Sequence, residues 1–248
     1  MENSPIEEKV KSLLKEIMAM PFSETIAIIE AERQLKVLYQ QDPTSISILI
    51  ALLFCNLEQG KREIALGLSN RIWREGGELS DFFELVYTDC LLNLGEIEKA
   101  YDLLQPHLQN PQENIDYFYM VLVKYALMSG DLYLLMQLGE YPDVYQWEPE
   151  LFDFAKNNAL NASAQSYRAL LNIIHSTIKQ FMCAFEYALY DDGIELLFYT
   201  NVSAEQNDNW QQVLSEKTDA YFEENELAEI DGLSVSFLNI NEHPAWAE

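Results

Sequence analysis

The chain has 248 residues, and 49% of them are hydrophobic, so it can bury a core of the size that a folded domain needs. Its 15 basic and 41 acidic side chains give a formal net charge of −26. That charge argues against binding to nucleic acids or anionic membranes, because both require Lys and Arg to neutralise phosphate. Composition therefore indicates a folded acidic protein whose partners are neutral or basic.

The negative charge is concentrated after residue 75. Residues 1–75 carry 9 basic and 11 acidic side chains, whereas the remainder carries 6 and 30. Residues 181–248 hold one basic residue, Lys217, against 15 acidic ones. Such a distribution steers basic partners toward one end of a molecule, and it also serves solubility alone. Both interpretations remain open at this stage.

The cysteines and the N-terminus predict a cytoplasmic protein. Cys55, Cys90 and Cys183 lie far apart in apolar stretches, without the spacing of a disulfide framework or a zinc site. The opening residues MENSPIEEKVKSLLKEI lack the apolar run of a signal peptide. No window approaches 18 uncharged apolar residues, so we expect no membrane span.

Residues 1–180 are predicted to form a domain of helical hairpins. Apolar residues recur there with helical spacing, and Pro142 is expected to end the main series. The last pair is interpreted as a degenerate or capping hairpin, because terminal repeats are usually atypical. The expected helices span residues 5–19, 23–41, 46–59, 61–75, 81–94, 97–109, 115–128, 131–139, 149–159 and 162–180.

A repeat is visible in the glycines. Gly60, Gly95 and Gly130 recur 35 residues apart, each between two apolar helical runs. A helix–Gly–helix unit with a period of about 34 residues is typical of a helical-hairpin solenoid. Glycine suits the left-handed conformation that ends a helix. Ala65 and Ala100 follow at the same offset, where a small side chain lets two helices approach closely.

The unit at residues 81–114 resembles a tetratricopeptide repeat. The family's small, large, Gly, Ala and large positions are occupied by Thr88, Leu91, Gly95, Ala100 and Leu104. The chain departs from the family at Leu53, Val123 and Leu135, and it lacks the Trp of the first helix. The resemblance covers residues 5–145 and implies an α-α superhelix of hairpins whose first helices line a concave groove.

Carried over position by position, the resemblance predicts an apolar and aromatic groove. Its lining would be Ile50, Phe54, Leu57, Phe82, Leu85, Asp89, Leu92, Tyr117, Met120, Lys124 and Leu127. A surface of this kind, if exposed, binds a peptide or helix through its aromatic anchors. Alternatively, the C-terminal segment or a second copy of the chain fills it.

Residues 181–248 predict a small acidic α+β domain of order β-β-α-β. Two runs of β-branched and aromatic residues surround the turn Tyr190-Asp191-Asp192-Gly193, a helix is expected over 208–225, and the sequence LSVSFLNI alternates. A three-stranded sheet of this size is marginal alone, so we expect it to dock on the last helices.

Motifs for catalysis and cofactor binding are absent from the sequence. It contains no phosphate-binding loop, dinucleotide fingerprint, zinc-protease motif or nucleophile elbow. His107, His175 and His243 are isolated, and His175 is interpreted as a core or interface residue. A pairing of Cys183 with His175 has no local signature. The sequence therefore predicts no catalytic residue, cofactor or metal.

The leading functional hypothesis is a non-enzymatic interaction module, an adaptor or chaperone-like protein that holds a polypeptide in the groove. One alternative is an acidic inhibitor, immunity protein or antitoxin that covers a basic partner. Another is an enzyme with an unrecognised C-terminal site. The acidic cluster is either a solvated helix end or a docking patch for a basic partner, and it comprises Glu223, Glu224, Glu226, Glu229 and Asp231.

Overall fold

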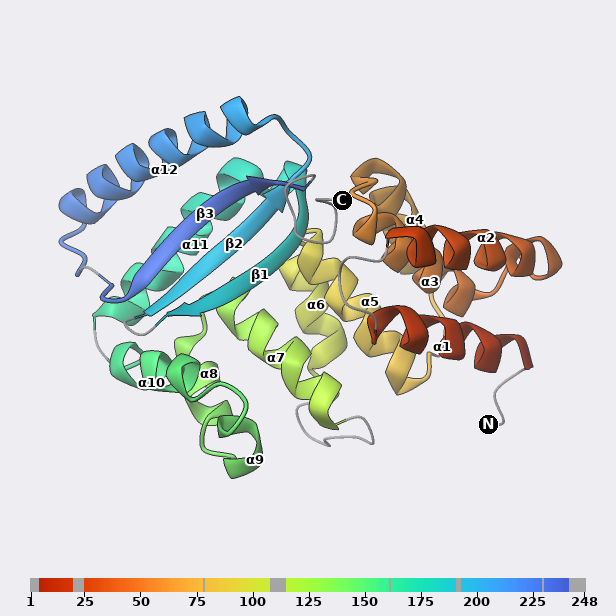
Figure 1. Cartoon of the computed structure of the whole chain (residues 1–248). Helices are drawn as coiled ribbons and strands as arrows, with labels where there is room; N and C mark the ends of the chain where they lie inside the picture. The colour runs from red at the N-terminus through yellow and green to blue at the C-terminus, as the bar shows by residue number, and fades with distance from the viewer. Residues whose placement is uncertain are drawn as a thin grey trace.

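The structure, a computed structural model, describes residues 5–19, 25–77, 79–107, 115–160, 162–190, 193–228 and 230–240. In these residues the chain is helical through Ile178 and ends in a three-stranded sheet with one further helix (Figure 1). The prediction of a mainly helical chain with a C-terminal β-β-α-β segment is confirmed.

The first eight helices of the described residues follow one another as antiparallel pairs. The pairs are α1 (Pro5–Met18) with α2 (Thr25–Gln41), α3 (Ile46–Glu58) with α4 (Arg62–Glu75), α5 (Asp81–Asn93) with α6 (Ile97–Leu104), and α7 (Ile115–Ser129) with α8 (Leu132–Leu138). The prediction of a last hairpin is wrong, because α10 (Pro149–Asn158) packs against α8, and α11 (Ser163–Ile178) packs against α12 and α7. Between α8 and α10 lies a one-turn helix, α9 (Pro142–Tyr145), at the proline where the sequence predicted only an end.

The three repeat glycines occupy equivalent turns, as predicted. Gly60, Gly95 and Gly130 have φ of +62°, +73° and +75°, in the left-handed region that favours glycine. The residue after each glycine donates its N–H to a carbonyl in the preceding helix, at 2.8, 2.8 and 2.9 Å respectively. Ala65 and Ala100 are fully buried, which fits close helix approach at these positions.

The C-terminal segment forms a mixed sheet. After the 3₁₀ turn η2 (Lys179–Phe181), β1 (Met182–Tyr190) pairs antiparallel with β2 (Gly193–Thr200). Helix α12 (Ala204–Glu224) then leads to β3 (Leu233–Asn239), which is parallel to β2. The predicted turn residues Asp191 and Asp192 lie outside the described residues. Alternate residues of β2 enter the same core cluster as the helices, so the sheet and the hairpins share one core.

The sheet segment packs against the row of repeat turns. A Cβ atom at Gly60 would lie 3.0 Å from Ile240, one at Gly95 would lie 3.2 Å from Met182, and one at Gly130 would lie 2.9 Å from the Cα of Arg168. These glycines are thus required for close approach as well as for their backbone conformation. The row of turns is the surface that receives α11, β1 and Ile240, the residue after β3.

Candidate functional site

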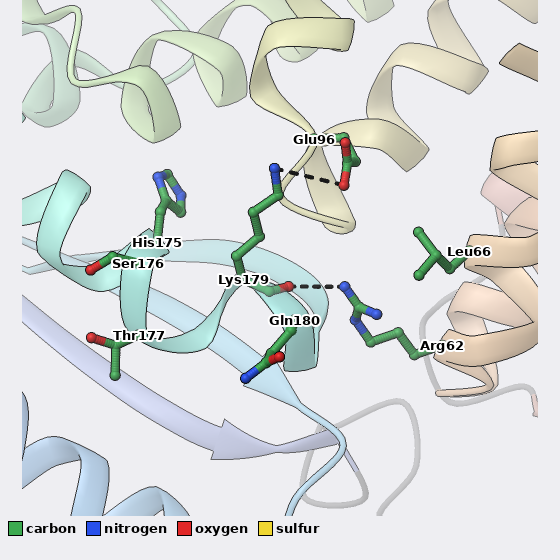
Figure 2. Close-up of a pocket in the computed structure, with 8 residues that line it drawn as sticks. All are labelled: Arg62, Leu66, Glu96, His175, Ser176, Thr177, Lys179 and Gln180. Carbon is green, nitrogen blue, oxygen red and sulfur yellow. Dashed lines mark hydrogen bonds and ion pairs between the residues drawn. The ribbon is translucent and has the colours of Figure 1, made fainter.

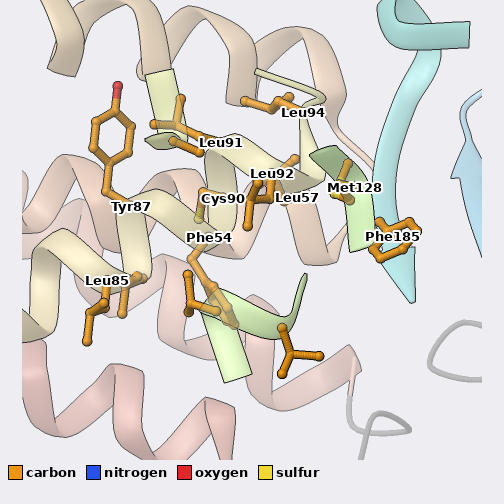
Figure 3. Packing of buried hydrophobic residues seen from close by; sticks show 14 of the residues in the cluster. Phe54, Leu57, Leu85, Tyr87, Cys90, Leu91, Leu92, Leu94, Met128 and Phe185 are labelled. Atoms are coloured by element: carbon orange, nitrogen blue, oxygen red, sulfur yellow. The ribbon is translucent and has the colours of Figure 1, made fainter. Parts of the chain in front are cut away.

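The predicted groove is mostly covered. Its buried members are Ile50, Phe54, Leu57, Phe82, Leu85, Leu92 and Leu127. Figure 3 shows Phe54, Leu57 and Leu92 packed within the helical core. An open groove would leave Phe54 and Phe82 accessible, but they are only 8% and 5% exposed, so the expectation of an open groove is wrong at these positions.

Helix α1 is what covers part of this face. It packs against α3 and buries its own apolar side. The ammonium groups of Lys11 and Lys15 lie 5.5 and 5.6 Å from the centroid of the Phe82 ring. An amphipathic helix at the start of a hairpin series must bury its apolar side somewhere, and here it does so over the first helices of the next pairs.

Asp89 and Lys124, the two charged residues of the predicted groove, form an ion pair inside the fold. Lys124 Nζ lies 2.7 Å from an oxygen of Asp89 and donates to Asn93 Oδ1 at 2.7 Å. The same amide oxygen accepts the backbone N–H of Phe185 at 3.1 Å. These contacts join α5, α7 and β1 into one polar cluster. Asp89 and Lys124 therefore hold elements together rather than line an open surface.

The remaining predicted groove residues differ from each other. The Tyr117 hydroxyl is buried and has no hydrogen-bond partner among the described residues. Burial, and secondarily the charge of Asp89, raises the pKa of Tyr117 well above 10. Met120 is 58% exposed. Among Phe54, Phe82, Tyr117 and Met120, only Met120 has a freely accessible side chain.

The acidic cluster lies at the end of α12 and in the following turn. Glu223, Glu224, Glu226 and Asp231 are exposed, and Glu229 lies outside the described residues. The last turn of α12 contains no basic residue, although a helix C-terminus favours positive charge. The position of these carboxylates is compatible with both sequence interpretations, a solvated end and a docking patch.

A pocket of about 450 Å³ opens where α4, α6 and α11 meet (Figure 2). Arg62 is buried beside it and donates from Nε to the Met182 carbonyl at 2.6 Å and from Nη2 to the Lys179 carbonyl at 2.9 Å. Lys179 Nζ lies 3.7 Å from Glu96. The charged groups of the pocket thus fasten the sheet segment to the hairpins.

Neither His175 nor Cys183 has the surroundings of a reactive pair. Burial, with a smaller contribution from Lys179, lowers the pKa of His175 to about 4. Its ring contacts Phe198 edge-on, at 6.3 Å between centroids. Burial raises the pKa of Cys183 to about 12, so the group is a neutral thiol at pH 7. His175 therefore lies at the interface between α11 and the sheet, as interpreted, although its buried Nε2 has no hydrogen-bond partner among the described residues.

An exposed aromatic cluster lies on α7 and the α8–α10 connection, where sequence reasoning placed no site. Tyr119 lies between Tyr141 and Trp147, with ring centroids at 5.8 and 6.3 Å. Tyr141 is 54% exposed and Trp147 is 42% exposed. We call these three residues the aromatic patch. Exposed Tyr and Trp side chains in contact with each other are typical of the anchors of protein interfaces.

The connection that carries the patch is fixed by its own sequence. Pro142 begins α9 and Pro149 begins α10, and both rings restrict the backbone. Val144, between them, is buried in the core. Gly139 crosses so close to Phe152 that a Cβ would lie 2.7 Å from it. Tyr141 and Trp147 are therefore held in place before any partner arrives.

The surroundings of the patch are acidic. Residues 140–153 contain five carboxylates and neither Lys nor Arg. Glu140, Asp143, Glu150 and Asp153 are exposed, whereas Glu148 accepts a hydrogen bond from the hydroxyl of Tyr187. This combination, two prolines around a Trp in an acidic stretch, is the sequence signal that could have located the patch.

Trp73 provides a comparison within the same molecule. It is 41% exposed, nearly as much as Trp147, and Lys99 Nζ lies 5.7 Å from the centroid of its ring. In the described part of the chain, no Lys or Arg occupies the corresponding position over Trp147. Trp147 is thus half-exposed and, among the described residues, has no cation over its ring.

Comparison with protein-family models, with curated proteins and with solved structures finds no match to this chain. None of the helices in its described residues combines the length and the apolar composition that crossing a membrane requires.

Proposed function

We propose that the chain is a non-enzymatic, tetratricopeptide-like helical-repeat module that binds a basic polypeptide segment on its aromatic patch. The observation that carries the proposal is the contact of Tyr119 with Tyr141 and Trp147 on a fixed connection bordered by carboxylates. An arginine or lysine of the partner would lie over Trp147 as Lys99 lies over Trp73.

Charge supports a basic partner. The net charge of −26 attracts a cationic segment over a distance of about 8 Å at physiological salt, and the carboxylates of residues 140–153 orient it at the patch. Rigid aromatic side chains lose little conformational entropy on binding, so they give affinity at low cost. The apolar groove is mostly buried and does not contribute to this binding surface.

The test is a fluorescence titration of the protein with a synthetic peptide of alternating arginine and glycine. We expect a saturable change in tryptophan emission that Trp147→Phe removes. Tyr141→Ala should weaken binding by about 30-fold, which is the effect of losing an interface anchor of about 2 kcal/mol. A peptide with glutamate in place of arginine should not bind.

Two variants with equal charge changes make the test specific. The first replaces Glu140, Asp143 and Glu150 by their amides, and the second replaces Glu223, Glu224 and Glu226. We expect the first to weaken binding and the second to leave the equilibrium affinity nearly unchanged. Equal losses would indicate unspecific attraction. A loss confined to the second variant would place the partner on the acidic end of α12, in favour of the acidic-inhibitor alternative. Either result would overturn the proposal.

A further inference from the structure

His107 and two carboxylates form a cluster at the open end of the third hairpin. Asp81 and Glu84 belong to the first turn of α5, three residues apart, so they lie on one side of the helix. The chain leaves α6 at Leu104 and returns to this point at His107. One oxygen or nitrogen atom from each of the three side chains lies within 4.8 Å of the other two.

The histidine is held in place before any ion arrives. His107 is 5% exposed, and its ring contacts Phe118 edge-on at 6.3 Å between centroids. Its Nε2 lies 3.0 Å from an oxygen of Glu84. Asp81 and Glu84 are only partly buried, so the cluster has one buried nitrogen and two oxygens that solvent reaches.

The spacing of the donor atoms fits a small divalent cation. Zinc binds imidazole nitrogen and carboxylate oxygen at about 2.0–2.2 Å, so tetrahedral ligand atoms lie about 3.4 Å apart. The Glu84–His107 separation is 3.0 Å, and no separation among the three ligand atoms exceeds 4.8 Å. Two carboxylates this close also repel each other, and a cation between them removes that repulsion.

We propose that Asp81, Glu84 and His107 bind one Zn²⁺ ion, with water in the remaining coordination position. A nitrogen donor with two carboxylates favours zinc over Mg²⁺ and Ca²⁺, which prefer oxygen ligands alone. The ion would join the first turn of α5 to His107, three residues after the end of α6, and so tie the two helices of this hairpin together. The site is independent of the aromatic patch.

The test is a calorimetric titration of the metal-free protein with ZnCl₂ in a buffer that contains 1 mM Mg²⁺, which occupies unspecific acidic sites. We expect one zinc ion per chain and a rise in the thermal midpoint when zinc is added. Co²⁺ should give the intense visible absorption of a four-coordinate site. His107→Ala and Glu84→Gln should each lower zinc affinity at least tenfold.

Two control variants change residues of the same types outside the cluster. Asp116→Asn removes one exposed carboxylate, and His175→Gln removes another histidine, so neither should change zinc affinity. If His107→Ala does not fold, Asp81→Asn and Glu84→Gln carry the test, since both retain the size of the side chain. Absence of saturable zinc binding up to 100 µM would overturn the proposal. Zinc binding that is unchanged in His107→Ala, Glu84→Gln and Asp81→Asn would overturn it as well.

Discussion

The face under α1 and the aromatic patch have similar side chains and different surroundings. Phe54 and Phe82 lie on the first helices of the second and third pairs and are buried. Tyr141 and Trp147 lie on the connection between α8 and α10 and are half-exposed. The difference is set by what packs on each face: α1 contributes to covering the first, and no element in the described residues closes over the second.

This difference separates stability from binding. Where a neighbouring element covers an aromatic side chain, its removal leaves a cavity and destabilises the fold. Where the ring is open, its removal changes a surface that a partner would contact.

Phe54→Ala should lower the free energy of unfolding by about 3–5 kcal/mol, because it leaves a cavity in the helical core. Phe54→Leu, which keeps most of the volume, is the control and should cost clearly less. Urea denaturation followed by circular dichroism measures both. A loss below about 1 kcal/mol for Phe54→Ala would mean that the face under α1 is open in solution.

The stability of the protein should depend on pH through His175, which lies where α11 packs against the sheet. Its pKa is about 4 in the folded state and near 6.5 when unfolded, so the unfolded state binds the proton more readily. Stability should therefore fall by up to about 3 kcal/mol as pH decreases from 7 to 4. Lys179 and Glu98 are the charged groups that act on this ring.

His175→Gln separates this contribution from the titration of the carboxylates. The free energy of unfolding of both proteins is measured at pH 7 and at pH 4.5. The original protein should lose more stability over this range than the variant, by most of the roughly 3 kcal/mol attributed to His175. If the two proteins lose equal stability, solvent reaches the imidazole, and α11 packs less closely against the sheet than in the structure.

Ala100→Leu should cost about 1–3 kcal/mol, because the larger side chain overpacks a fully buried position between helices. Ala100→Ser, with a similar volume, is the control for the loss of apolar character. The denaturation midpoint measures the effect. An unchanged midpoint would contradict the close approach of α6 to its neighbours.

Trp147→Ala should have the smallest effect on stability, about 1 kcal/mol or less, because the ring is half-exposed. The same variant should remove binding of the arginine–glycine peptide. Thermal unfolding and the peptide titration, performed on one preparation, separate the two effects. A large loss of stability would make the patch part of the core and weaken its assignment as a binding surface.

Much of the backbone could be predicted from the sequence. The glycine spacing located three equivalent turns, because the left-handed conformation after a helix strongly favours that residue. The alternation in residues 233–240 located the last strand, because one side of a sheet strand faces the core. These signals are local, so they need no knowledge of distant contacts.

The candidate site could not be predicted in the same way. The periodicity of α3 and α5 shows that Phe54 and Phe82 lie on an apolar side, and it does not show which element covers that side. The covering of this face by α1 depends on tertiary packing. The approach of His107 to Asp81 and Glu84 likewise depends on how α6 returns along α5.

The contact between the Gly60 turn and Ile240 has a consequence for how the protein is made. The two residues are 180 positions apart in the chain. At about 5–20 residues per second, a ribosome needs about 10–40 s to pass from one to the other. During this interval the Gly60 turn lacks the cover that Ile240 provides, and contacts between distant positions form slowly. The nascent chain therefore leaves the Gly60 turn open to chaperones for at least this interval, whereas the Gly130 and Gly95 turns meet Arg168 and Met182, which are added earlier.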